Sequence, residues 1–344
     1  MSAPVLEVSD LRVSFATEEG VVQAVDGVSF DLRAGEILSI VGESGSGKSV
    51  TALTVMGLSR GPNASISGAA RLGDTDILSL DDEAMRSVRA ERIAMIFQDP
   101  MTALNPVYRV GDQIVEQIRA HTDASKQEAR ERAIESLRSV GIPNPERRYG
   151  SYPHEFSGGM RQRAMIALAL ALEPEVLIAD EPTTALDVTI QAQILRLLEQ
   201  LNADRGLAVI LITHDLGVVA EVADRTLVMY AGRVVEEGSL DDIFYDPQHP
   251  YTWGLLGSLT RLDQPRPAHL PSIPGAPPSL ISPPQGCHFR PRCPHEFTKC
   301  LTTPDLEGRL PESPGHRDRC WLEPDTKRAR RVVEGRIGLV AGAE

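Results

Sequence analysis

The feature that most constrains this chain is a glycine-rich turn set between an apolar strand and a helix. Residues 42–49 read Gly-Glu-Ser-Gly-Ser-Gly-Lys-Ser, which fits the phosphate-loop pattern G-x-x-x-x-G-K-[ST]. The turn follows the predicted strand Glu36–Val41 and precedes the predicted helix Ser49–Gly57, as a phosphate loop does. The alternative, a glycine-rich turn with a solvated lysine, needs neither flank. The sequence therefore predicts an α/β fold that binds ATP or GTP.

The residue types in this turn suit a nucleoside triphosphate. Glycines let successive backbone N–H groups point at the β-phosphate, and the N-terminus of the following helix adds partial positive charge. Lys48 would neutralise β- and γ-phosphate oxygens, and the Ser49 hydroxyl would bind Mg²⁺. The residues predicted to bind nucleotide here are Gly42, Glu43, Ser44, Gly45, Ser46, Gly47, Lys48, Ser49 and Val50.

A second acidic element fits the same site. The apolar run that starts at Val176 ends in Asp180 and Glu181. The first carboxylate, at the strand tip, can hold Mg²⁺, and the second can orient or deprotonate an attacking water. A solvated acidic strand end is the alternative for such a dipeptide standing alone. Together with the phosphate loop, the pair predicts a hydrolytic site.

Charge and hydropathy exclude several other classes of protein. The chain has 35 basic and 48 acidic residues, a net charge of −13, so no basic surface points to nucleic acid. The longest apolar stretch, Ala164–Leu172, is far shorter than the roughly 20 residues of a membrane-spanning helix. The N-terminus lacks the basic-then-apolar pattern of a signal peptide. We therefore expect a protein kept in the cytosol.

Composition and periodicity divide the chain into parts. Fifteen of the 25 prolines and all four cysteines fall between Pro247 and Cys320, which indicates a boundary near residue 246. We expect an α/β core (1–98 and 173–245), a helical insert (99–172), a Pro- and Cys-rich extension (246–327) and a tail (328–344). Further strands are predicted at Leu6–Phe15, Val28–Leu32, Val176–Ala179, Ala208–Thr213 and Thr226–Tyr230. Helices are predicted at Val110–Ala120, Lys126–Val140 and Arg161–Leu172.

Several more motifs stand in order around these elements. Phe156-Ser-Gly-Gly-Met160, followed by Arg161-Gln-Arg163, resembles the signature motif of ATP-binding-cassette (ABC) ATPases. Four further positions are similar to this family: Gln98 to its glutamine loop, Thr184-Ala-Leu-Asp187 to its D-loop, His214 to its switch histidine, and Phe15 to the aromatic residue that stacks on adenine. The resemblance covers about residues 5–245. It implies a P-loop ABC cassette, with a mixed sheet and a helical insert.

The resemblance also implies roles for these residues. Glu181 would be the general base, His214 would contact the γ-phosphate, and Gln98 would sense Mg²⁺ and the attacking water. Mg²⁺ would be held through Ser49, Gln98 and Asp180, and Asp187 would belong to the nucleotide site. Ser157, Gly158 and Gly159 precede a predicted helix and would form an anion site for the nucleotide of a partner cassette. Phe156 and Met160 depart from the usual leucine and glutamine of the signature.

The work that this ATPase would drive follows from the same resemblance. The short interval from Ser49 to Ser157 argues against a repair-type cassette, and the single phosphate loop against a translation-type one. The stretches 98–106, 273–280 and 286–294 resemble the ATPases of oligopeptide and dipeptide importers. That branch implies two membrane permease subunits, a second ATPase subunit (a heterodimer by default, otherwise a homodimer), an extracytoplasmic peptide-binding protein, and a position at the cytoplasmic face of the membrane. The rivals are import of nickel or another small solute, and a soluble regulatory cassette.

The four cysteines point to a metal. Cys287, Cys293, Cys300 and Cys320 are separated by 5, 6 and 19 residues, and structural disulfides are rare in a reducing cytosol. Four thiolates suit zinc or a [4Fe–4S] cluster, and the C-x-x-C pattern typical of zinc is absent. The importer resemblance favours the cluster, as a staple for the Pro-rich extension. Zinc, with His288, His295 or His316 as a substitute ligand, and unmetallated thiols stay open.

Overall fold

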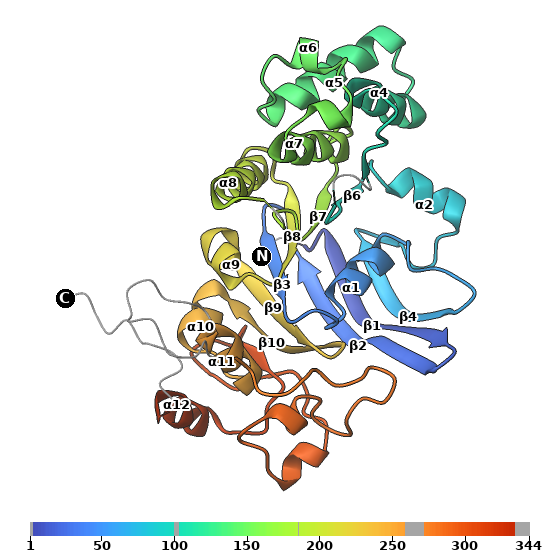
Figure 1. Ribbon diagram of the computed structural model, residues 1–344. Helices are drawn as coiled ribbons and strands as arrows, with labels where there is room; N and C mark the ends of the chain where they lie inside the picture. The colour runs from blue at the N-terminus through green and yellow to red at the C-terminus, as the bar shows by residue number, and fades with distance from the viewer. Residues whose placement is uncertain (1–2, 100–102, 185, 259–271, 334–344) are drawn as a thin grey trace, which may run out of the picture.

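The computed structural model describes residues 3–99, 103–184, 186–258 and 272–333 (Figure 1). Three parts of the motifs named above therefore lie outside the described residues: positions 100–102 after Gln98, Ala185 of the D-loop-like segment, and the end of the tail from residue 334.

The larger sheet carries the core of the molecule. Its strand order is β11-β12-β10-β9-β3-β8-β7-β6 across the described ranges, and β9, β3, β8, β7 and β6 run parallel. Every residue of β3, β6, β7 and β8 is buried, as expected for parallel strands covered on both faces. The parallel strands are β3 (Ile37–Val41), β6 (Ile93–Ile96), β7 (Val176–Asp180), β8 (Ala208–Thr213) and β9 (Arg225–Tyr230). The predicted apolar strands are confirmed.

The smaller sheet is antiparallel and packs beside α1 (Lys48–Val55). It consists of β1 (Leu6–Thr17), β2 (Gly20–Leu32), β4 (Ala64–Leu72) and β5 (Thr75–Asp76), in the order β2-β1-β4-β5. The predicted strand Val28–Leu32 is the end of the longer β2, because the chain turns at residues 18–19 and pairs with β1 along most of its length. Strand β4 was not predicted.

Helices surround the larger sheet, and one group of them stands apart. The helices near the sheet are α2 (Asp82–Val88), α8 (Val188–Arg205), α9 (Leu216–Val222), α10 (Leu240–Tyr245) and α11 (Pro250–Gly257). The separate group, in the upper part of Figure 1, is α4 (Val110–His121), α5 (Lys126–Ser139), α6 (Pro145–Arg148), the 3₁₀ turn η1 (Pro153–Glu155) and α7 (Gly158–Ala169). Helix α7 begins three residues earlier than predicted, because the Ser157 side chain caps it by accepting from Met160 N. None of the described helices has the length and apolar composition needed to cross a bilayer.

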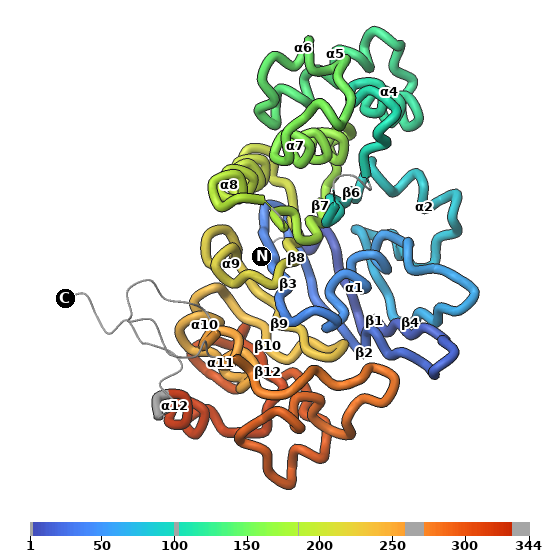
Figure 2. Tube along the Cα trace, in the orientation of Figure 1, coloured from blue at the N-terminus to red at the C-terminus, as the bar shows by residue number. Residues whose placement is uncertain are grey.

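The C-terminal part is built into the cassette. Strand β12 (Arg317–Asp318) pairs with β10 (Arg233–Ser239), and β11 (Glu307–Gly308) pairs with β12, so both extend the larger sheet. The remaining elements are the 3₁₀ turns η2 (Arg290–Arg292) and η3 (Thr298–Leu301) and helix α12 (Pro324–Val333). A single apolar cluster combines Tyr230 and Val235 of the sheet with Tyr251 and Phe289 of the extension. Figure 2 shows α10 and β12 beside β10 in the lower part of the molecule.

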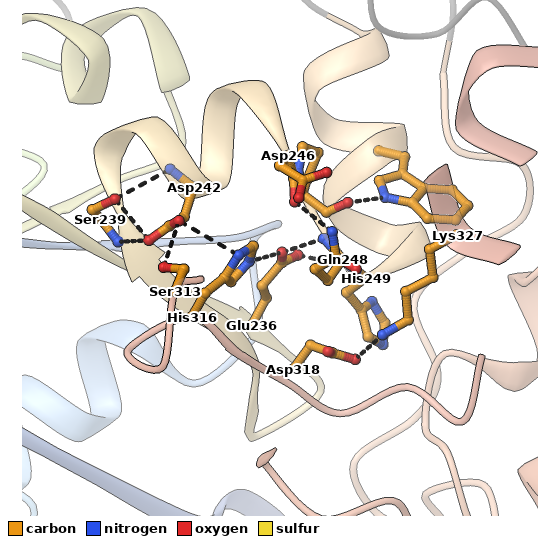
Figure 3. Close-up of polar contacts among 12 residues, drawn as sticks. Glu236, Ser239, Asp242, Asp246, Gln248, His249, Ser313, His316, Asp318 and Lys327 are labelled. Carbon is orange, nitrogen blue, oxygen red and sulfur yellow. Dashed lines mark hydrogen bonds and ion pairs between the residues drawn. The ribbon is translucent and has the colours of Figure 1, made fainter. Parts of the chain in front are cut away.

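A buried polar network fastens the two parts together (Figure 3). The fully buried carboxylate of Glu236, on β10, accepts from the backbone N–H groups of Gln248 and His249 and contacts His316 Nε2 at 2.8 Å. Beside it, Lys327 Nζ donates to Asp318 Oδ1 at 2.6 Å, and both side chains are buried. Helix α12 thus runs across the predicted boundary at residue 328, with Lys327 anchored inside the fold.

Candidate nucleotide site

The predicted site residues meet at one edge of the larger sheet. Strands β3, β8, β7 and β6 are parallel neighbours, so their carboxyl ends lie together, where open α/β sheets bind ligands. β3 leads into the phosphate loop, β7 ends at Asp180, β8 ends just before His214, and β6 ends two residues before Gln98. Figure 1 shows α1 starting at this edge.

Two glycines of the loop occupy places that no other residue fits. Gly42 has φ +152°, and a Cβ there would lie 2.1 Å from the backbone oxygen of Met229. Gly47 has φ +100°, and its Cβ would lie 2.4 Å from the backbone oxygen of Ala24. Both contacts are with backbone oxygens rather than with the ends of flexible side chains. The loop is therefore held close against strand residues on two sides, and its conformation is fixed by packing as well as by glycine's freedom.

The loop lysine closes back on the loop. Lys48 Nζ donates to the carbonyl oxygens of Gly42 (2.7 Å) and Glu43 (2.9 Å) and to Ser46 Oγ (3.3 Å). Burial lowers the pKa of Lys48, while the charges of Glu181, Asp180 and Glu43 oppose that shift. The ammonium group is thus near several carboxylates and held at the centre of the loop, where phosphate oxygens would replace its carbonyl partners.

The predicted Mg²⁺ ligands are partly together. Ser49 Oγ donates to Asp180 Oδ1 at 3.1 Å, which joins the phosphate loop to the end of β7. Burial raises the pKa of Asp180, the hydroxyl of Ser49 lowers it, and the neighbouring Glu181 raises it. A hydroxyl and a carboxylate so placed are a donor set that Mg²⁺ accepts. The third predicted ligand, Gln98, faces Glu181 instead.

Glu181 is the point on which the other catalytic candidates converge. Its Oε2 accepts from Gln98 Nε2 and from Thr184 Oγ1, both at 2.9 Å, and its Oε1 lies 3.0 Å from His214 Nδ1. Burial alone would raise the pKa of Glu181, but the hydrogen bonds from His214 and Thr184 and the charge of Lys48 lower it overall. Its φ of +46° is uncommon for a residue other than glycine. The carboxylate is therefore ionised and fixed in one orientation.

The signature-like segment lies in a different part of the molecule. Ser157 and Gly158 are exposed at the start of α7, whereas Phe156 is buried. A Cβ on Gly159 would lie 2.7 Å from Ile190 Cγ2, so α7 packs closely on α8 there. Asp187 caps α8 by accepting from Ile190 N. In Figure 1, α7 lies among the upper helices and α1 lies below, beside β1 and β2. The structure thus places the signature in the helical part, away from its own phosphate loop.

The remaining predicted residue of the nucleotide site is on the smaller sheet. Phe15 lies near the end of β1, opposite Val22 of β2 and Ala64 of β4, and it is partly buried against the core. Strands β1 and β2 both contact α1, the helix that the phosphate loop opens.

The four cysteines line one pocket. Cys287, Cys293, Cys300 and Cys320 surround it together with His249, Phe289, His295 and Trp321, among other residues. All four are free thiols. Burial, together with the neighbouring thiols, raises the pKa of Cys293 to about 12. Within the part of the chain described, no group of three or more His, Cys, Asp or Glu residues is arranged to hold a metal ion.

Comparison with known proteins identifies the class. The ABC transporter family profile matches residues 25–184, and the profile of the oligopeptide/dipeptide transporter C-terminal region matches residues 235–300. The dimeric structure of a post-hydrolysis state of the ATP-binding cassette MJ0796, bound to ADP and Pi, is 29% identical with a TM-score of 0.61, covering 68% of this chain and 98% of its own. The phosphate loop, the carboxylate pair and the mixed sheet are therefore those of an ABC ATPase.

Whole-chain relatives narrow this to one family. The dipeptide transport ATP-binding protein DppD of Bacillus subtilis is 53% identical over 96% of this chain and 98% of its own length. The oligopeptide transport ATP-binding protein OppD of Salmonella typhimurium is 54% identical over 92% of this chain and 93% of its own. This chain belongs to the family of ATP-binding subunits of oligopeptide and dipeptide ABC transporters.

Sequence reasoning missed three residues that touch the site. Thr184 was noted only as part of the D-loop, yet its hydroxyl binds Glu181. Tyr251 and Arg292, from the extension, both hydrogen-bond Glu43 of the phosphate loop. The spacing of Thr184 three residues after Glu181 was a usable signal. No local pattern links Glu43 to Arg292, which is 249 residues away.

Proposed function

We infer that this chain is the ATP-binding and ATP-hydrolysing subunit of an ABC importer of oligopeptides or dipeptides. The observation that carries the inference is the convergence of Gln98, Thr184 and His214 on the carboxylate of Glu181, beside the phosphate loop. Relatives named as peptide transport ATP-binding proteins match nearly the whole chain, including the extension.

The geometry of this chain supports the following roles in hydrolysis. Phosphate oxygens replace the carbonyl partners of Lys48, which neutralises their charge. Glu181, ionised and held by three neighbours, accepts a proton from the attacking water. The water oxygen bonds to the γ-phosphorus while the bond from that phosphorus to the β–γ bridging oxygen breaks, and ADP leaves. His214 keeps that carboxylate oriented and would contact the γ-phosphate of bound ATP. Ser49 and Asp180 would hold Mg²⁺, which when bound supplies positive charge to the phosphates.

The exposed signature supports an assembly of two cassettes. Ser157 and Gly158 are exposed at the N-terminus of α7, and such termini attract phosphate. A second ATPase subunit would place its nucleotide there, and the nucleotide of this chain would be completed in the same way by the partner. The helical part, residues 99–172, would dock on two permease subunits at the cytoplasmic face of the membrane. A heterodimer is the default, and the binding protein outside delivers the peptide.

The extension, residues 246–327, would be stapled by a [4Fe–4S] cluster. Four thiols from separate turns line one pocket with aromatic neighbours, which fits the four-cysteine set of such a cluster. The thiolate ligands of a single zinc ion all lie about 2.3 Å from one centre. Each cysteine of a [4Fe–4S] cluster binds a different iron, so the four sulfurs need only surround a common space. The proposal of a cluster therefore rests on the pocket that the four cysteines share. When bound, the cluster supplies four cross-links between loops. Protein purified without oxygen should contain iron and show a broad visible absorption band, and the absence of both would overturn this part.

The catalytic assignment is tested with Glu181→Gln. Without the base, phosphate release should fall about 100-fold or more, while equilibrium ATP binding is retained because the phosphate loop is untouched. The matched control is Glu175→Gln, just before the other end of β7, where the carboxylate pairs with Arg92. Turnover by Glu181→Gln equal to that of the control would refute the assignment.

The transporter assignment has its own test. The chain should co-purify with two membrane permeases when they are expressed together, and its ATPase rate should rise when peptide-loaded binding protein is added to the reconstituted complex. A chain that stays apart from the permeases would support the soluble regulatory cassette instead.

A further inference from the structure

One side chain of the extension reaches into the phosphate loop. The guanidinium of Arg292 forms a bidentate pair with the carboxylate of Glu43, with Nη1 2.6 Å from Oε2 and Nη2 3.1 Å from Oε1. Arg292 is the last residue of the 3₁₀ turn η2, and its side chain is 5% exposed. Glu43 is the second residue of the loop, directly after Gly42. The contact therefore joins the cysteine-bearing region to the nucleotide site.

Every N–H donor of the Arg292 side chain has a hydrogen-bond acceptor. Its remaining donors bind the backbone oxygens of Pro274 (2.9 Å) and Ile273 (3.2 Å) and the hydroxyl of Tyr230 (3.3 Å). An arginine has five N–H donors in a rigid planar fork, and the five bonds here use the whole set. The fork is thus oriented by the extension and the sheet before it meets Glu43, so the carboxylate is placed by a rigid group.

A second group of the extension holds the backbone of the same residue. Tyr251 Oη accepts from Glu43 N at 2.8 Å, and Tyr251 is fully buried. Its ring packs against Tyr230 and Phe289, with centroids 4.6 and 5.4 Å away. The N–H group of Glu43 is therefore held by a side chain whose position is restrained by packing on both rings.

The contacts continue to the lysine of the phosphate loop. The carbonyl oxygen of Glu43 accepts from Lys48 Nζ at 2.9 Å. Glu43 is thus held by its carboxylate and its N–H on the extension side, while its carbonyl sets the position of Lys48. A shift of Glu43 would move a partner of the residue that neutralises phosphate.

We propose that Arg292 is a positioning residue for nucleotide binding, through which the C-terminal extension sets the conformation of the phosphate loop. The proposal rests on the proposed ATPase function and deepens it. Tyr251 acts with Arg292 by fixing the backbone of the same loop residue. The extension then helps to form the nucleotide site, in addition to any role of its cysteines in holding a cluster.

The test compares Arg292→Gln and Arg292→Lys with Arg328→Gln in the full chain. Arg328 is the matched control, because it also lies in the C-terminal part and pairs with a carboxylate, that of Asp246, away from the loop. The readouts are the Kd of a non-hydrolysable ATP analogue, kcat and KM, and hydrogen exchange of the peptide that contains residues 42–49. We expect Arg292→Gln to raise Kd and KM about fivefold or more, with a smaller change in kcat and faster exchange in the loop.

Arg292→Lys keeps the charge and loses the bidentate fork, so its Kd should lie between those of Arg292→Gln and wild type. Arg328→Gln should keep the wild-type Kd and loop exchange. If Arg292→Gln also loses exchange protection throughout the extension, Arg292→Lys and Tyr251→Phe decide, and each must still raise Kd.

Wild-type Kd and loop exchange in the Arg292 variants would overturn the inference. An inactive wild-type protein would instead refute the proposed function, so the two failures are distinguishable.

Discussion

The buried pair of Lys327 and Asp318 predicts a large and pH-dependent effect of one substitution. The two groups are 2.6 Å apart, with side chains 0% and 3% exposed, and they join α12 to β12, which pairs with the sheet at β10 (Figure 3). Lys327→Met keeps the apolar stem and removes the charge. It leaves Asp318 buried without its partner, and breaking a buried pair in this way costs about 3–5 kcal/mol.

The size of this loss should depend on pH, and the sign follows from Asp318. Burial raises the pKa of Asp318 to about 6, even though Lys327 beside it lowers that pKa. Removing Lys327 raises the pKa further. A carboxyl whose folded pKa lies above its unfolded value stabilises the folded state at low pH, and this contribution is lost as pH rises through the folded pKa. The deficit of Lys327→Met should therefore be largest near pH 8 and shrink towards pH 5.

The assay is urea denaturation of the full chain at pH 8 and at pH 5, with the double variant Asp318→Leu/Lys327→Met as the matched control. The double variant removes both charges and should recover most of the loss, and its difference from wild type should change less with pH. A Lys327→Met deficit below about 1 kcal/mol, or one that is equal at the two pH values, would refute the reasoning, since a solvated pair behaves in that way.

Three further predictions concern a histidine, a glycine and a helix cap. Burial lowers the pKa of His249 to about 4, and its Nδ1 accepts from Tyr251 N; stability should fall by up to about 3 kcal/mol as pH drops from 6.5 to 4. His249→Asn keeps a cap acceptor and should remove that loss. The measurement is the difference in unfolding free energy between variant and wild type at each pH. Asp318 titrates in the opposite sense in both proteins, so its contribution cancels in this difference. Gly47→Ala places a Cβ 2.4 Å from a backbone oxygen and should abolish binding of an ATP analogue. Gly206→Ala is the control: its φ is +65° and nothing lies within 4 Å of its Cβ, so it should only lower the melting temperature. Binding of the analogue by Gly47→Ala would contradict the geometry. Ser239→Ala removes the capping box of α10 and should lower the free energy of unfolding by about 1 kcal/mol, measured from the denaturation midpoint. An unchanged midpoint would show that the cap does not stabilise the helix.

The grouping of the candidate nucleotide-site residues could be predicted because its signals are local and ordered. The strands that carry it are uninterrupted apolar runs, such as Val176–Ala179, and each is followed by a polar residue that contributes to the candidate site. Parallel neighbours bring those residues to one edge. Strand β4 lacked such a signal, because Gly68 and several alanines and serines weaken its alternation. The start of α7 was missed because Gly158 and Gly159 are poor helix formers, and the Ser157 cap outweighs them.

The contacts of the extension could not be predicted, because they join residues far apart in the chain. Glu236 and His316 are 80 residues apart, yet the histidine lies 2.8 Å from a fully buried carboxylate. Charged residues in a sequence are usually solvated, so nothing marks Glu236 as buried. The apolar side chains of the extension are likewise placed by distant partners, because Phe289 and Tyr251 share their core with the sheet.

The way the extension is attached decides how far its influence reaches. Strand β12 pairs with β10, β10 with β9, and β9 with β3, the strand that leads into the phosphate loop. Arg292 adds a second, direct route to the same loop through Glu43. Two independent connections between the same parts resist relative motion more than either would alone. The loop on which ATP acts is therefore supported from both sides, by the sheet behind it and by the cysteine-bearing region beside it.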